Sequence, residues 1–489
     1  MSASSSPQPS LRVAVIGAGP SGIATGHELL AQGFSEFTIF EKASKPGGTW
    51  HNESYPGLAC DVWAHSYTYS YAPNPDWSAS FAERAEIEAY LQRCAKDFGL
   101  EPHIRCNTCI THAHYQGDGV WQLQSAEGDT FEFDVVINAM GNQHTALYPE
   151  VKGMDSFEGP SWHSTTWDND IDLSDKHIAI VGSAASAVQV VPEVTKMAKQ
   201  VTVLQRTPNW IMPRGRVTYS DSKRKLFNLV PPYLRITQKV QRALMGMIEQ
   251  ASTLGHKRMD QFENRVLGFI KKAIDDPKTQ EAVTPKSRYA CKRGLVSDGF
   301  YPSLNEEHVE LVAEGLTEVR PNSIVTSSGR EIECDVIAYC TGYRILDFDR
   351  IEVTGQNGES LAKVMHEAPE AHKGISVPNF PNFFFAVGPN GLVLNVPYFM
   401  TVEQNVATIV RLLKEKQSAG AKAISVKVEA SREYNDWLLP RFPLYSWGHG
   451  SCNSYYRFDN GRAPFLFPGN FKMYKKLQDA GGLEDYETA

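Results

Sequence analysis

The closely spaced glycines of one turn near the N-terminus are the first residues suited to chemistry. Gly17 permits a tight turn, Gly19 lets the backbone approach a pyrophosphate, and Gly22 allows a helix to pack closely on a strand. Pro20 and Ser21 begin that helix, whose free N–H groups and dipole favour phosphate. The turn therefore predicts a dinucleotide site.

An acidic residue follows at the spacing that such a site requires. Glu41 lies 19 residues beyond Gly22, after a second apolar run, and is placed to accept hydrogen bonds from a ribose diol. Lys42 follows it and is expected in the same site. Because a carboxylate repels a 2′-phosphate, this site suits FAD or NAD rather than NADP.

A second turn of this kind lies roughly 165 residues further on and departs from the pattern at one position. Ala184 stands where the second glycine is expected, so its Cβ is expected to push a pyrophosphate outward. The residues of this turn predicted to contact a nucleotide are Gly182, Ser183, Ala184, Ser186 and Ala187.

The strand after this second turn ends in a cation instead of an acid. Arg206 can face a 2′-phosphate with its fork of donors, and Thr207 can add a hydroxyl. The alternative is that Arg206 is a solvated residue at a strand end. Its position where the ribose would lie favours the first interpretation, and NADPH as the second nucleotide.

These sites require two strand–turn–helix–strand units. The first is predicted from Arg12–Ile16 to Phe37–Phe40, and the second begins with Ile178–Val181 and ends with Val201–Leu204. We predict an α/β fold with two Rossmann-like dinucleotide-binding domains, for FAD and NADP, and a helical insertion. The expected division is 1–150 and 341–489 for FAD, 151–213 and 286–340 for NADP, and 214–285 for the insertion.

The insertion is predicted from helical periodicity. Ile236, Val240 and Leu244 recur four residues apart among basic and amide residues, as do Phe262, Val266 and Ile270. Such a stretch can lie on a membrane, but helices packing on their own domain are commoner and we expect that here. Strands are predicted at Val319–Val325 and Ile332–Tyr339, and sheet and loops from Asn379 onward.

Composition narrows the function classes. The 48 basic and 56 acidic residues give a net charge of -8 without a block of like charge, which excludes the usual signature of nucleic-acid binding. No apolar run reaches the roughly 18 residues of a membrane span, and the N-terminus lacks a secretory signal pattern. We therefore expect a cytoplasmic protein without membrane insertion.

The cysteines are scattered, as free thiols are in reducing compartments. Cys106 and Cys109 have the CxxC spacing of a redox dithiol. They fall in His103–His114, an alternating stretch that predicts a strand and would point the thiols to opposite faces. Two unrelated cysteines are the preferred interpretation.

Two further segments carry a family resemblance. The first fits the fingerprint [A/G]GxWx4[F/Y]P[G/M]x3D with Gly47, Gly48, Trp50, Tyr55, Pro56, Gly57 and Asp61. The second fits FxGx3Hx3W[P/D] with Phe157, Gly159, His163, Trp167 and Asp168. The sequence thus resembles the type I Baeyer–Villiger monooxygenases of the flavin-containing monooxygenase superfamily, from Arg12 to Lys475.

The resemblance implies FAD and NADPH as cofactors, O2 and a ketone as substrates, and conversion of the ketone to an ester or lactone through a C4a-peroxyflavin. Arg293 is implied to stabilise that peroxide and the oxyanion of the adduct, with Asp61 positioning Arg293 and offsetting its charge. Lys292 is implied to hold the 2′-phosphate. The family also implies a monomer.

The same resemblance suggests supporting residues. His163 and Trp167 are expected to couple the two domains rather than to catalyse. Gly48, Thr49 and Trp50 are expected at the flavin, with Trp50 packing beneath it. The turn ending in Asn390 resembles one that approaches the flavin, and the segment around Tyr455 one that lines the substrate pocket.

Three other functions stay open at this stage. Flavin-containing monooxygenases that oxidise soft N or S atoms share both nucleotide sites, although their second fingerprint usually ends in Tyr or Phe. A pyridine-nucleotide disulfide reductase would need Cys106 and Cys109 as its dithiol. A non-catalytic NADPH sensor would follow if Ala184 abolished productive nucleotide binding.

Overall fold

The computed structural model describes residues 11–452, 456–458 and 461–489. Its first sheet has five parallel strands in the order β19-β7-β1-β2-β3. The strands are β1 (Val13–Ile16), β2 (Phe37–Phe40), β3 (Ile104–Arg105), β7 (Val135–Asn138) and β19 (Phe383–Phe385). Helix α1 (Pro20–Ala31) connects β1 to β2, as the first glycine turn predicts.

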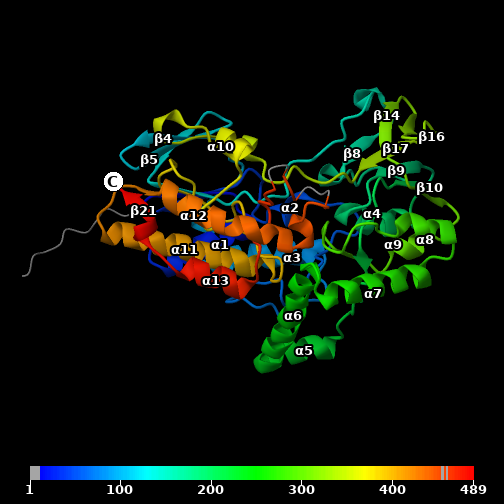
Figure 1. Cartoon of the computed structure of the whole chain (residues 1–489), viewed down its shortest axis with the longest axis horizontal. Coiled ribbons are helices and arrows are strands. Elements are labelled where there is room, and N and C mark those ends of the chain that lie inside the picture. The colour runs from blue at the N-terminus through cyan, green and yellow to red at the C-terminus, as the bar shows by residue number, and fades with distance from the viewer. Residues whose placement is uncertain (1–10, 453–455, 459–460) are drawn as a thin grey trace, which may run out of the picture.

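A second parallel sheet repeats this plan toward the other end of the molecule (Figure 1). Its order is β13-β10-β9-β17-β8, and α4 (Ala185–Val194) connects β9 to β10. The strands are β8 (Ser161–His163), β9 (His177–Val181), β10 (Gln200–Leu204), β13 (Val309–Val312) and β17 (Val336–Tyr339). The predicted α/β class with two Rossmann-like units is confirmed.

Two smaller sheets correct the predicted strands. Cys106 and Cys109 lie in the loop between β3 and β4 rather than in one strand through His103–His114, because Asn107 has a φ of 52°, which interrupts an extended backbone. The predicted strand Val319–Val325 is a tight antiparallel pair, since a turn reverses the chain after Arg320. The sheets contain β4 (Ile110–Gly117), β5 (Val120–Ser125), β6 (Thr130–Phe133) and β18 (Glu352–Thr354), and β14 (Leu316–Arg320), β15 (Ser323–Thr326) and β16 (Glu331–Glu333).

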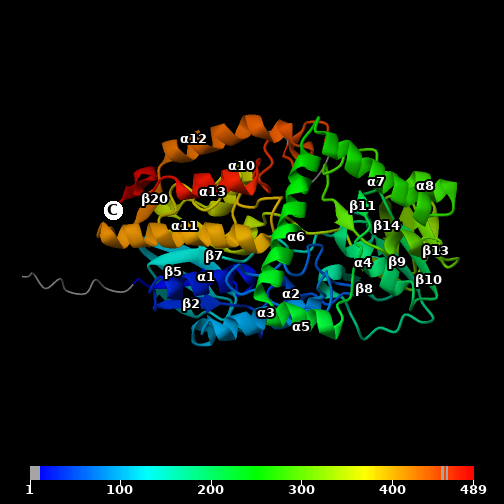
Figure 2. The ribbon, with the colours of Figure 1, turned by 90° about the horizontal axis from the view of Figure 1, so that it is seen from below.

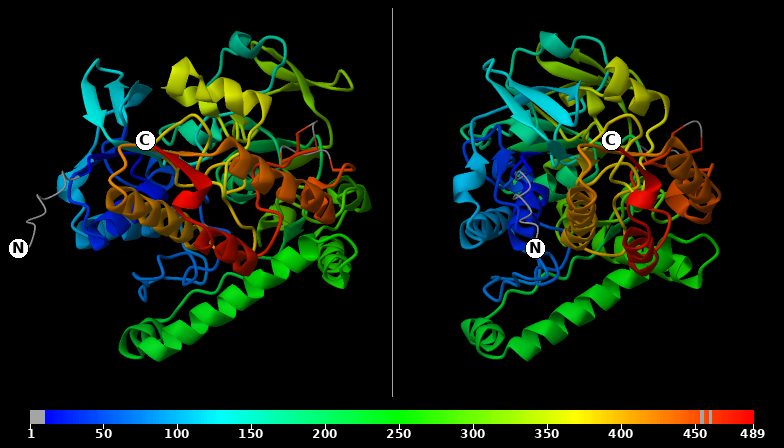
Figure 3. Two further views of the ribbon diagram at one scale, coloured as in Figure 1. Left: turned by 60° about the vertical axis from the view of Figure 1, so that its left-hand side comes forward. Right: turned by 90° about the vertical axis from the view of Figure 1, so that its left-hand side faces the viewer.

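The insertion is helical, as predicted, and α6 stands along one side of the molecule (Figures 2 and 3). The expectation that these helices pack on their own protein holds for α6, which buries Leu234 and Met245, but the periodic residues Ile236, Val240 and Leu244 lie on its exposed face. It also holds for α7, where Val266 and Ile270 are buried. The helices are α5 (Asp221–Leu229), α6 (Pro231–Ser252), α7 (Lys257–Ala273) and α8 (Pro277–Val283).

The chain after Asn379 is largely helical, which corrects the prediction of sheet and loops. Helix α11 (Tyr398–Ser418) packs against α1 and buries one face rich in Val, Ile and Leu. Helices α12 (Val428–Leu438) and α13 (Phe471–Asp479) lie beside it, with a two-stranded sheet of β20 (Ile424–Val426) and β21 (Tyr486–Thr488) (Figure 1).

Short elements complete the described chain. They are α2 (Thr49–Asn52), α3 (Arg84–Asp97), α9 (Phe300–Ser303), α10 (Leu361–Glu367), β11 (Ile211–Met212), β12 (Leu295–Val296) and 3₁₀ helices at Glu101–His103, Met154–Ser156, Ser164–Thr166, Phe348–Arg350, Gln356–Gly358, Leu439–Leu444, Ser446–Gly448 and Leu483–Asp485.

One disulfide contradicts the prediction that the cysteines are free thiols. Cys291 is bonded to Cys452, 161 residues away, with both side chains buried. The bond joins the segment before Lys292 to a C-terminal loop. Cys106 and Cys109 are free thiols and are not bonded to each other.

Candidate active site

A cavity of about 880 Å³ lies where residues following β1, β2 and β7 meet the start of α4. Carboxyl ends of parallel strands are where α/β proteins bind ligands. Of the predicted site residues, those that line the cavity are Gly17, Gly19, Pro20, Ser21, Glu41, Lys42, Gly48, Thr49, Trp50, Asp61, Ser186, Lys292 and Arg293. One cavity is thus lined by residues of both glycine turns and of both segments that carry the fingerprints.

The first glycine turn has the form that a pyrophosphate needs. Gly17 has a φ of 105°, and a Cβ there would lie 2.8 Å from the carbonyl oxygen of Ala139. A Cβ on Gly48 would lie 2.9 Å from the Cα of Gly19. Two backbone segments therefore pass each other without side chains beside the free N-terminus of α1, which fits a phosphate cradle. The Ser21 hydroxyl is hydrogen-bonded to Tyr398 at 2.8 Å.

Glu41 sits at the end of β2 as predicted, and the backbone fixes its carboxylate. One oxygen accepts from the N–H of Ala18 at 2.8 Å and the other from the N–H of Ala43 at 2.9 Å. The residue is 5% exposed and lines the cavity. A carboxylate held in this way keeps lone pairs for a ribose diol.

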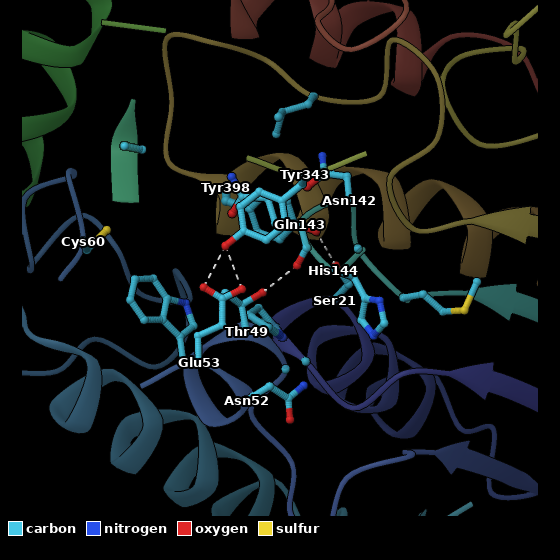
Figure 4. Close-up of a pocket in the computed structure, with 18 of the residues that line it drawn as sticks. Ser21, Thr49, Asn52, Glu53, Cys60, Asn142, Gln143, His144, Tyr343 and Tyr398 are labelled. Atoms are coloured by element: carbon cyan, nitrogen blue, oxygen red, sulfur yellow. Dashed lines mark hydrogen bonds between the residues drawn. The ribbon is translucent and has the colours of Figure 1, made fainter. Parts of the chain in front are cut away.

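The residues of the first fingerprint are held by short contacts. Thr49 donates to the carbonyl of Gln143 at 3.3 Å (Figure 4). The Trp50 indole donates to the Tyr67 hydroxyl at 3.1 Å and its ring is nearly buried. These hydrogen bonds hold Thr49 and Trp50 in the cavity lining, which also includes the first glycine turn.

The second glycine turn begins α4. Gly182 has a φ of 115°, and a Cβ there would lie 2.4 Å from the carbonyl oxygen of Cys340. Ala184 is exposed in ordinary extended backbone, so its methyl group strains nothing in the turn. The Asn209 amide donates to the carbonyl of Ser183 at 2.9 Å, and Ala187 is buried.

Two cations lie close enough to interact electrostatically, one of them shortly after β10. Arg206 is exposed and Lys292 is half-buried. The pKa of Lys292 is lowered mainly by burial and, to a smaller extent, by the positive charge of Arg206. The Ser183 hydroxyl donates to the carbonyl oxygen of Thr207 at 3.4 Å. Since like charges repel, a site that brings these cations together suits a bound phosphate.

Asp61 and Arg293 form an ion pair within the lining of the cavity. Arg293 donates to an Asp61 oxygen at 2.6 Å, although 232 residues separate them in sequence. Their side chains are 23% and 39% exposed respectively, so both keep access to the cavity. The predicted pairing is present in the structure.

His163 and Trp167 lie behind the cavity rather than in its lining. His163 accepts from the N–H of Thr165 at 3.1 Å, and burial lowers its pKa to about 4, so it is neutral near pH 7. Its ring contacts those of Tyr148 and Tyr343. Trp167 packs edge-on against Trp162. These contacts suit coupling between segments rather than proton transfer.

One buried acidic residue that lines the cavity, Glu53, was not predicted from the sequence. Both oxygens of Glu53 face the Tyr343 hydroxyl, at 2.8 and 2.7 Å (Figure 4). Burial raises the Glu53 pKa to about 7, while the phenol hydrogen bond lowers it. Glu53 falls in an undefined position of the first fingerprint, so the motif gives no signal for it. Tyr55, Gln189 and Tyr398 were likewise not singled out as site residues but line the cavity.

Other predicted site residues are absent from the described lining of the cavity: Gly22, Gly182, Ser183, Ala184, Ala187, Arg206, Thr207, His163, Trp167 and Asn390. The Asn390 amide donates to the carbonyls of Ala463 and Leu466, and the residue is buried behind the site. Its φ of 54° shapes the turn instead. Tyr455 lies outside the described residues.

Within the described ranges, no group of His, Cys, Asp and Glu side chains is arranged to hold a metal ion. No helix in that same part of the chain is long and apolar enough to cross a membrane.

Solved structures share the fold over nearly the whole chain. A closed cyclohexanone monooxygenase matches with a TM-score of 0.87 at 24% identity, covering 98% of this chain and 99% of that one. A steroid monooxygenase bound to NADP matches with a TM-score of 0.85 at 26% identity, covering 98% and 99%. Both likenesses confirm the arrangement of two Rossmann-like units.

Sequence relatives identify the family. A protein of Streptomyces coelicolor named Baeyer-Villiger monooxygenase is 33% identical, covering 98% of this chain and 92% of the relative. One of the same name from Pseudomonas aeruginosa is 34% identical, covering 95% and 89%. The family model of flavin-binding monooxygenase-like proteins matches residues 10–414. The chain therefore belongs to the flavin-binding monooxygenase-like family.

Proposed function

We propose that this chain is an FAD- and NADPH-dependent monooxygenase of the Baeyer–Villiger type, which uses O2 to convert a ketone to an ester or lactone. The observation that carries the proposal is the Asp61–Arg293 pair at 2.6 Å in the cavity that also contains the first glycine turn. The names of the Streptomyces and Pseudomonas relatives support the same reaction.

The residues present fit both cofactors. The cradle of Gly17, Gly19 and Gly48 suits a flavin dinucleotide, with Glu41 at its ribose. When bound, the flavin supplies the electrons that activate O2. The neighbouring cations Arg206 and Lys292 suit the 2′-phosphate of NADPH.

Arg293 is proposed to stabilise negative charge at the reacting carbonyl. When a nucleophile attacks a ketone, charge gathers on the carbonyl oxygen, and a fixed guanidinium lowers the barrier by facing it. Asp61 holds the guanidinium in place and offsets its charge before substrate binds. We propose positioning for Asp61 and direct contact with substrate for Arg293.

The apolar part of the cavity lining is proposed to hold a neutral ketone. It contains Met245 and Ile248 of α6 and residues of a loop after β19. That loop contributes Leu392, Val393, Leu394 and Val396. An apolar wall excludes water, which strengthens the electrostatic effect of Arg293.

A substrate panel tests the reaction class. FAD-loaded protein is given NADPH, O2 and either ketones, tertiary amines or sulfides, and products are identified by mass spectrometry. We expect esters or lactones from ketones. Oxygenation of amines or sulfides alone would contradict the proposal and favour the N- or S-oxygenating class.

An Arg293→Ala variant tests the assigned role. It is expected to consume NADPH but to release hydrogen peroxide in place of ester, with Arg293→Lys intermediate because a lysine keeps the charge without the fork of donors. Ester formation by Arg293→Ala at the wild-type rate would rule out this role.

The division into domains is proposed on the same basis. Residues 1–150 and 341–489 are assigned to FAD, residues 151–213 and 286–340 to NADP, and 214–285 to the insertion. We also propose a monomer, which light scattering of the FAD-loaded protein tests directly.

A further inference from the structure

Glu53 and Tyr343 connect two segments that are far apart in sequence. Glu53 directly follows α2, and Tyr343 lies in the link that leaves β17, 290 residues later. Glu53 is 4% exposed, and its two oxygens lie 2.8 and 2.7 Å from the one Tyr343 hydroxyl (Figure 4). The pair lines the cavity described above.

The geometry suits a carboxylic acid better than a carboxylate. A neutral acid and a phenol bring two protons to three oxygens, so each group can donate to the other. An ionised carboxylate would have one donor for two buried oxygens, and burying such a charge without a partner is costly. In keeping with this, burial raises the pKa of Glu53 to about 7 despite the opposing hydrogen bond.

The titratable neighbours of Glu53 do not offset its ionisation. Tyr55, on the same segment, has its pKa raised by burial and by the negative charges of Glu53 and Asp61. Asp61 is already paired with Arg293. His163 lies beyond Tyr343 and has its pKa lowered to about 4. Among the described residues, Glu53 forms no ion pair.

At the same place the segment after α2 packs against α4 and the link after β17, and this contact is called the seam. Tyr55 donates to Gln189 of α4 at 3.1 Å, and Gln189 donates to the carbonyl of Ala59 at 2.9 Å. A Cβ on Gly57 would lie 2.4 Å from the Gln189 carbonyl oxygen, so the backbones touch. The Tyr343 ring lies 6.2 Å from that of His163. Glu53 therefore sits where the segment after α2 meets elements of the second sheet.

We propose that Glu53 is a positioning residue whose proton, shared with Tyr343, holds the segment after α2 against the link after β17, and whose ionisation loosens this seam and weakens NADPH binding. The part of this proposal that concerns NADPH binding rests on the proposed function. The part that concerns the contact between the two segments rests only on the geometry of the seam. Loosening follows because the carboxylate gains water only if the packed segments separate.

The variant Glu53→Gln separates charge from shape, since the amide has the size of the neutral acid and cannot ionise. Anaerobic flavin reduction by NADPH is followed in FAD-loaded protein between about pH 6 and 9. The wild type is expected to show a one-proton transition near pH 7 with the Kd for NADPH rising about tenfold. Glu53→Gln is expected to keep the low-pH Kd for NADPH over the whole pH range.

Two further variants sharpen the test. Tyr343→Phe removes the hydrogen bond that lowers the Glu53 pKa, so its transition should move to higher pH. Glu249→Gln is the matched control, because Glu249 accepts from the Tyr445 hydroxyl at 3.0 Å away from this seam. It should keep the wild-type transition. A Glu53→Gln protein that retains the wild-type transition would overturn the proposal.

A second readout does not depend on the reaction. Because the folded pKa of Glu53, about 7, lies above its ordinary value of 4.5, the contribution of Glu53 to stability is fully present below about pH 4.5 and is lost as the pH rises to about 7. The wild-type unfolding midpoint should fall between about pH 4.5 and 7 more than that of Glu53→Gln. The infrared band of a protonated carboxyl should be present at about pH 6, lost by about pH 9, and missing in the variant.

These readouts separate the two proposals. If NADPH reduces no flavin at any pH, the proposed function fails, and the infrared band with the unfolding midpoint decides the Glu53 proposal. A band lost with rising pH, together with a variant-specific change in midpoint, supports it. Glu53 already ionised at about pH 6, or equal midpoints in both proteins, contradicts it.

Discussion

Charge compensation governs the candidate site at the scale of single residues. Arg293 has Asp61 at 2.6 Å, while Arg206 and Lys292 repel each other and suit an anion brought by the cofactor. The first arrangement is complete within the protein and the second requires a ligand. The two therefore respond differently to substitution.

Asp61→Asn is expected to lower ketone oxygenation by about tenfold to a hundredfold, because Arg293 loses the charge that fixes its position. Hydrogen peroxide should account for a larger share of the NADPH consumed. Parallel assays of NADPH, ester and peroxide measure this. Glu83→Gln, which breaks the exposed pair with Arg216, is the control, and equal coupling in both variants would contradict the role of Asp61.

Arg206→Ala is expected to raise the KM for NADPH by about 10- to 100-fold, the loss of charge-assisted hydrogen bonds to the 2′-phosphate. The KM for NADH should stay nearly constant, since NADH lacks that group. Steady-state kinetics with both nucleotides give the ratio, with Arg216→Ala as a control at a surface ion pair. Equal effects on the two nucleotides would show that Arg206 does not select NADPH.

At the scale of elements, the first glycine turn sets how closely α1 approaches β1. A Cβ on Gly22 would lie 1.8 Å from the carbonyl oxygen of Gly17, so Gly22→Ala must distort the turn. The purified variant is expected to lack flavin, as its absorbance spectrum will show. Gly268→Ala, where nothing lies within 4 Å of the new methyl group, should retain flavin. Full flavin occupancy in Gly22→Ala would contradict this account.

The strand–turn–helix units could be predicted because each is encoded locally by apolar runs and glycine spacing, as at Gly17 and Gly182. The placement of Glu53 could not, because its partner Tyr343 is 290 residues away and the acid occupies an undefined motif position. The exposed Ile236 and Val240 show a second limit of prediction from sequence. Helical periodicity identified α6, but apolar spacing alone does not say which face packs inward.

At the scale of the whole molecule, the Cys291–Cys452 bond ties the segment carrying Arg293 to the C-terminal loop. Cys291→Ser is expected to lower the free energy of unfolding by about 2–4 kcal/mol, as loss of a long cross-link usually does. Urea unfolding measures this, with Cys109→Ser, a free thiol, as the control. Reduction of the wild type should reproduce the loss, and equal stability of both variants would contradict it.

The central claim is that oxygen from O2 enters a ketone, and labelled oxygen tests it most directly. FAD-loaded protein is supplied with NADPH, a panel of neutral ketones and ¹⁸O2, and the products are analysed by mass spectrometry. We expect an ester or lactone carrying one ¹⁸O atom for each NADPH consumed productively. NADPH oxidation that yields only labelled hydrogen peroxide, or labelled amine and sulfide oxides without any ester, would contradict it.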